Sequence, residues 1–179
     1  MKTLIFFFVI FFPAIALSQN KVNQALHDKC IVVMDEQTAA LHAGDFEAVK
    51  RITLWKINNC MKFFGSDDLF DEQGFLALAE RELGNLKEAL QIARECIYKR
   101  YGIPSCHLEE ALSLKALGLK NKADISGERF IRICERYIDQ LQAKLENPNL
   151  GNLEVRLINS KLYLHRAMLN SFTRDWKKD

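Results

Sequence analysis

The chain has 179 residues and carries 25 lysines and arginines against 23 aspartates and glutamates, which gives a formal net charge of +2. This length suits one domain or one short repeat array. A nearly neutral chain with interspersed charges lacks the basic surface that nucleic-acid binding requires, so we expect no nucleic-acid partner.

The first eighteen residues have the layout of a secretory signal peptide. Lys2 supplies a positive start, residues 4–12 form an unbroken apolar run, and residues 16–18 offer small side chains around a peptidase cut. A transmembrane anchor needs about 20 apolar residues, and this segment is shorter. We therefore expect cleavage before Gln19, export to the periplasm or the extracellular space, and one mature domain over 19–179 with no membrane span.

Apolar residues recur at spacings of three and four along the rest of the chain, in windows too long for strands. Ser105 and Asn121 stand where helix N-caps belong, whereas Gly74 and Gly127 fall inside helical windows, where glycine is unfavourable. The sequence predicts an all-α fold with helices at about 22–42, 46–63, 69–83, 86–99, 105–117, 122–145 and 152–173.

Two glycines mark a repeated unit. Gly84 and Gly118 are 34 residues apart, and each has one alanine seven residues before it and another five residues after it. This is the period and small-residue pattern of the tetratricopeptide repeat, which the chain resembles over about residues 30–135. An earlier copy at Gly44-Asp45-Phe46 is less regular, because Gln37 holds its first small position.

The resemblance implies antiparallel helix hairpins at about 22–63, 69–99 and 105–145, stacked as a short right-handed array. The helix at about 152–173 would cap the open end of the stack; its other reading is an exposed partner-binding helix. In such arrays the first helices of the repeats line a concave groove that binds proteins or peptides. The groove positions that carry over to this chain are Met34, Thr38, His42, Arg81, Glu82, Leu112 and Lys115.

The sequence shows no catalytic constellation. None of the four histidines has cysteines or carboxylates at metal-ligand spacing, and neither a phosphate-binding glycine loop nor a nucleophile elbow is present. His107 with Glu109 and Glu110 is better explained as solvated charge on a helix surface. The acidic residues between 67 and 72 fit a solvated loop or a helix N-terminus better than a calcium site. We therefore expect no enzymatic activity, no cofactor and no metal.

The cysteines suggest disulfides. Residues equally far from a hairpin turn lie level with each other, because both helices rise equally per residue. Cys30 and Cys60 are symmetric about the turn at Gly44, and Cys106 and Cys134 about the turn near Gly118. This symmetry predicts the bridges Cys30–Cys60 and Cys106–Cys134, with Cys96 free. The competing bridge is Cys96–Cys106, and the plainest reading makes all five cysteines small buried hydrophobic residues.

Together these features predict an exported protein–protein interaction module with a protein or peptide partner, such as an envelope scaffold or a neutraliser of a periplasmic toxin. The alternative is an enzyme without a readable motif, such as a carboxylate-using hydrolase of envelope polymers. A cleft bearing two carboxylates with separated pKa values would favour the enzyme. A shallow groove with ordinary side chains would favour the binding module.

Overall fold

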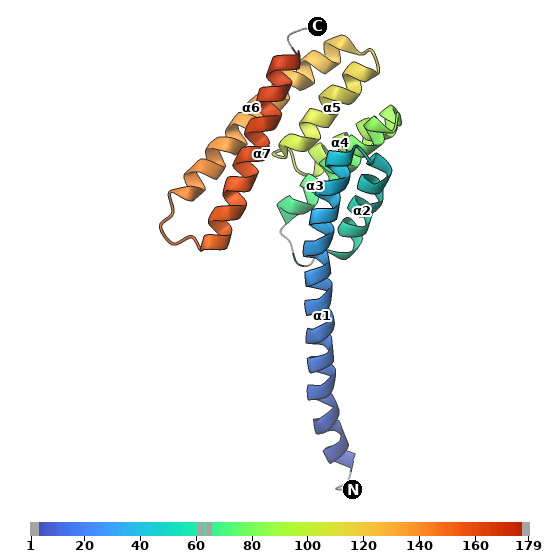
Figure 1. The fold of residues 1–179 in the computed structure, drawn as a ribbon, viewed down its shortest axis with the longest axis vertical. Helices are drawn as coiled ribbons and strands as arrows, with labels where there is room; N and C mark the ends of the chain where they lie inside the picture. Colours follow the sequence, from blue (N-terminus) through green and yellow to red (C-terminus); the bar gives the residue numbers. More distant parts are fainter. Residues whose placement is uncertain (1–3, 61–62, 64–65, 177–179) are drawn as a thin grey trace. The chain divides into compact units, whose positions relative to one another are not determined.

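The computed structural model describes residues 4–60, 63 and 66–176, with side chains described at 23–60, 63, 71–152, 154–156 and 158–176. Within these residues the chain is all-α and contains no strand (Figure 1), as the helical periodicity predicts. The helices are α1 (Leu4–Ala43), α2 (Phe46–Asn59), α3 (Ser66–Glu82), α4 (Leu86–Lys99), α5 (Pro104–Ala116), α6 (Lys120–Leu145) and α7 (Asn152–Trp176).

The chain divides into two compact units, which meet in sequence within α3, after Leu69. In the first unit α1 packs against α2. In the second unit α5 packs against both α4 and α6, and α6 packs against α7. The backbone of α1 includes residues 4–18 of the predicted signal segment, whose side chains lie outside the described residues. Among the described residues, no helix combines the length and the apolar character needed to cross a membrane.

Three turns of the chain share one backbone geometry. Gly44, Gly84 and Gly118 have φ angles of 68°, 85° and 73°, in the left-handed region that favours glycine. The residue after each glycine donates its N–H to the carbonyl five positions earlier, over 2.8–3.0 Å, and the glycine donates to the carbonyl three positions earlier, over 2.9–3.2 Å. These bonds satisfy the free carbonyls at the end of each helix. The three glycine positions found in the sequence therefore mark equivalent turns.

The two predicted N-caps, Ser105 and Asn121, are wrong. α5 begins at Pro104 with Ile103 as its N-cap, and α6 begins at Lys120 with Leu119 as its N-cap. Proline is favoured at the first helical position because its missing N–H would be unpaired there anyway. Ser105 and Asn121 therefore lie inside the helices; the Ser105 hydroxyl donates instead to the Asp71 carboxylate, 3.3 Å away.

Gly74 and Gly127 lie inside helices because other elements come too close for a side chain. A Cβ at Gly74, on α3, would lie 2.6 Å from the Cβ of Ser105 on α5. A Cβ at Gly127, on α6, would lie 3.0 Å from the rings of Phe172 and Trp176 on α7. Each glycine thus lets two elements pack more closely than alanine allows.

The largest core cluster lies among α5, α6 and α7. At its centre the rings of Phe130 and Phe172 meet edge to face, with centroids 4.8 Å apart. Each fully buried large apolar side chain contributes about 1.5–3 kcal/mol, so this cluster is the main apolar attachment of α7. Its buried members are Ala111, Phe130, Cys134, Ile138, Leu141, Ile158, Leu162 and Phe172.

Candidate functional site

Helix α5 carries polar and charged side chains at buried positions. His107, Glu109 and Glu110 are 0%, 4% and 6% exposed. The prediction that these three residues are solvated surface charge is therefore wrong. Helices distant in sequence cover them and supply their partners, and sequence spacing along α5 alone gives no sign of that.

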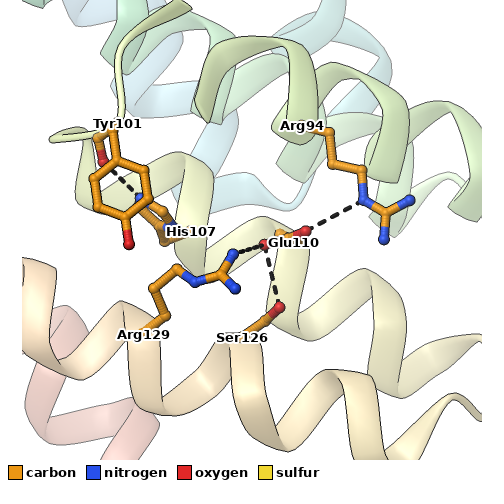
Figure 2. Close-up of polar contacts among 6 residues, drawn as sticks. All are labelled: Arg94, Tyr101, His107, Glu110, Ser126 and Arg129. Atoms are coloured by element: carbon orange, nitrogen blue, oxygen red, sulfur yellow. Dashed lines mark hydrogen bonds and ion pairs between the residues drawn. The ribbon is translucent and has the colours of Figure 1, made fainter. Parts of the chain in front are cut away.

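Glu110 joins three helices through its carboxylate (Figure 2). It accepts hydrogen bonds from Arg94 Nε of α4 at 3.2 Å and from the Ser126 hydroxyl of α6 at 3.1 Å. Arg129, also on α6, contacts the same carboxylate at 3.5 Å. A buried carboxylate is tolerated when it is paired and hydrogen-bonded in this way. The arrangement fixes α5 between its neighbours.

His107 holds the loop between α4 and α5. Its Nε2 lies 2.6 Å from the carbonyl oxygen of Tyr101 (Figure 2), so the ring donates from that nitrogen. Burial lowers the pKa of His107, and the bond to Tyr101 opposes the shift. The imidazole is therefore neutral at pH 7, and its buried Nδ1 has no hydrogen-bond partner among the described residues.

Glu109 joins α5 to α3 through an ion pair. Arg81 Nε donates to its carboxylate over 2.8 Å, and the same guanidinium contacts Glu82 at 2.6 Å. Burial raises the pKa of Glu109, and the charge of Arg81 opposes this shift. Neither Glu109 nor Glu110 lines either cavity described below, so these carboxylates lend no support to the hydrolase alternative.

A groove of about 380 Å³ lies between α5 and α7. Apolar side chains from both helices form most of its lining, and Lys115, Ser171 and Asp175 add polar groups. The ammonium of Lys115 lies 4.8 Å from the ring centroid of Trp176, which is cation–π geometry. The lining residues are Leu108, Leu112, Lys115, Met168, Ser171, Phe172, Asp175 and Trp176.

The structure distributes the predicted groove positions unequally. Leu112 and Lys115 both line the groove between α5 and α7. Arg81 and Glu82 pair with each other, and Arg81 also serves Glu109, so the Arg81 charge already has protein partners. The three positions in the first unit, Met34, Thr38 and His42, are exposed on successive turns of α1.

The α7 wall of the groove is absent from the predicted set. The resemblance covers only residues up to about 135, so it assigns no role to Met168, Phe172 or Trp176. The available signal was the recurrence of apolar residues along 152–173, a helix predicted either to cap the stack or to bind a partner. In the structure α7 packs against α6, which fits the capping reading, and it also forms one wall of the groove.

The disulfides agree with half of the prediction. Cys30 and Cys60 are bonded, with Cα atoms 5.8 Å apart. The predicted Cys106–Cys134 bridge is wrong, because Cys106 bonds Cys96, with Cα atoms 6.2 Å apart. Cys134 is a buried free thiol and points toward α7, where its sulfur donates to the His165 carbonyl over 3.5 Å. Level placement about a turn therefore did not ensure that the two side chains face each other.

A second cavity, of about 310 Å³, runs along α7 alone. Its lining residues are Asn159, Leu162, Tyr163, Arg166, Ala167 and Asn170. Among the described residues, no group of three histidine, cysteine or acidic side chains is placed to hold a metal ion. A scan of protein-family models and a search of curated proteins both find no match for this chain.

Proposed function

We propose that the chain is an exported helical-repeat module, similar to the tetratricopeptide repeat, that binds a segment of a partner protein in the groove between α5 and α7. The observation that carries the proposal is the presence of Leu112 and Lys115 in one groove. The family resemblance assigns both residues to partner binding. The equivalent turns at Gly44, Gly84 and Gly118 also support a repeat origin.

The lining of the groove indicates the kind of segment it accepts. Leu108, Leu112 and Met168 offer an apolar surface, and burying apolar area contributes about 25 cal/mol per Å². Lys115 and Asp175 carry opposite charges from opposite walls. An apolar side chain of the partner would supply affinity, and polar groups beside it would fix its orientation.

The proposed compartment is the periplasm or the extracellular space. Two disulfides are typical of proteins in oxidising compartments, and the first eighteen residues have the pattern of a signal peptide. An envelope scaffold and a neutraliser of a periplasmic toxin both fit a small exported binding module.

Two serine variants on α7 test the groove. Ser171 lines the groove, whereas Ser160 is exposed elsewhere on the same helix and lines neither described cavity. Ser171→Trp places an indole in the groove, and Ser160→Trp makes the same change outside it. Each tagged protein is cross-linked in its native host, and recovered partners are quantified by mass spectrometry.

We expect wild type and Ser160→Trp to recover the same partner and Ser171→Trp to lose it by at least roughly tenfold, the equivalent of about 1.4 kcal/mol. Circular dichroism checks that both variants stay helical. Equal recovery by the two variants would exclude this groove as the binding surface.

A further inference from the structure

The imidazole of His165 is sealed between α6 and α7. His165 is 1% exposed, and its Nδ1 lies 2.7 Å from the carbonyl of Lys161, one turn earlier on α7, so this nitrogen donates. Its Nε2 is buried and has no hydrogen-bond partner among the described residues. The ring lies 4.7 Å from that of Tyr137, measured between centroids. Nε2 can therefore accept a proton, but among the described residues no acceptor is placed to receive a hydrogen bond from the protonated nitrogen.

The groups around His165 do not favour a positive charge. From α6 the ring of Tyr137 lies against its ring, and the Cys134 thiol donates to its backbone carbonyl. The charge that acts on the ring comes from Lys161 on the same helix, and it is positive, like the charge of a protonated imidazole. Burial lowers the pKa of His165, and Lys161 lowers it further against the opposing backbone bond.

We propose that the α6–α7 interface is an acid-operated latch, in which protonation of His165 releases α7 and dismantles the groove. A proton on Nε2 would create a buried cation with an unpaired donor, which is strongly unfavourable. Acid therefore favours conformations in which His165 reaches water, and α7 must leave α6 for that to happen. Because α7 contributes Met168, Ser171, Phe172, Asp175 and Trp176 to the groove, its release removes one wall. The latch rests on the proposed function only in naming the groove as the site that is lost.

Hydrogen exchange of the free, full-length mature protein tests the latch without any partner. Protection factors of α7 amides are measured from pH 7.5 to 5.0, with the intrinsic exchange rate divided out. One proton taken up on opening makes the opening constant rise about tenfold per pH unit below about 6.5, until the folded pKa is reached. We expect α7 protection to fall by that factor while α1 and α2 change less.

Three variants assign the effect to one ring. His165→Gln and His165→Phe cannot ionise in this range, so either one that folds should abolish the pH dependence of α7 protection. His42→Gln, at an exposed position of the first unit, should retain it. Protection that is equal at pH 7.5 and 5.0 in wild type would overturn the latch, as would a dependence that survives replacement of His165, since another titrating group would then be responsible. If α7 opens as expected but Ser171→Trp leaves partner recovery intact, the proposed function fails and the latch stands.

Discussion

At the residue scale, the carboxylate of Glu109 depends on a single guanidinium. Glu109 is 4% exposed and its described partner is Arg81, from a helix 28 residues away in sequence. Removing one member of a buried ion pair leaves an uncompensated charge, which costs more than the pair contributes when intact. Arg81 is therefore a poor residue for testing partner binding by charge reversal, because the fold itself needs its charge.

We expect Arg81→Met to lower the free energy of unfolding by roughly 3–5 kcal/mol at pH 8. The loss should shrink toward pH 5. Without Arg81 the pKa of Glu109 rises further above its unfolded value, so the folded state takes up the proton first and recovers stability as the pH falls. Chemical denaturation at both pH values measures this loss.

Arg132→Met is the matched control, because the pair between Arg132 and Glu128 is exposed. Its loss should lower the free energy of unfolding by less than about 1 kcal/mol. Equal losses in the two variants would contradict the assignment.

The free thiol of Cys134 leads to a second prediction at this scale. Burial raises its pKa to about 12, and the charge of Glu135 acts in the same direction. The thiolate is the reactive form, so the native protein should not react with Ellman's reagent at pH 8. Denaturation in guanidinium without reductant should release one reactive thiol per chain. Two or more released thiols would mean that a disulfide is absent.

At the scale of helices and turns, the sequence was most informative where one residue type has one physical role. Glycine alone adopts the left-handed turn at low cost, so Gly44, Gly84 and Gly118 located their turns correctly. The sequence was least informative on α5. Its buried acids are paired by Arg81, Arg94 and Arg129 from other helices. Such partners become visible only when the helices are packed together.

The contact at Gly74 gives a prediction for the packing of α3 on α5. Gly74→Ala places a methyl group 2.5 Å from the Ser105 hydroxyl oxygen, and the helices must shift to accept it. We expect a loss of about 1–3 kcal/mol, typical of overpacking, measured as a lower midpoint of thermal unfolding. Gly102→Ala is the control, since a Cβ there meets nothing within 4 Å. A neutral Gly74→Ala would mean that α3 and α5 lie farther apart.

At the scale of the whole molecule, each unit contains one disulfide. Cys30–Cys60 closes a loop of 30 residues in the first unit, and Cys96–Cys106 closes one of 10 in the second. In the chain-entropy model these bridges stabilise by about 3.6 and about 2.7 kcal/mol. Replacing each pair by serines should therefore affect its own unit, with the larger loss for Cys30 and Cys60. Hydrogen exchange resolved by peptide measures the stability of the two units separately. An equal loss of stability in both units would contradict the expectation that each bridge stabilises its own unit.

The processing of the chain belongs to the same scale. The signal pattern predicts a mature protein that begins at Gln19 or within a few residues of it. The intact mass of protein purified from the native host measures this directly. Retention of residues 1–18 in the mature product would contradict export by signal cleavage.

The bridge between Cys30 and Cys60 spans the exposed turn at Gly44 and Asp45. A protease that cuts this turn therefore breaks the backbone between α1 and α2, but the disulfide still joins the two fragments covalently. The nicked chain would migrate as one species on a non-reducing gel and as two fragments after reduction. A preparation that looks intact by size alone can thus already be cleaved, and the paired gels reveal both the nick and the covalent link that conceals it.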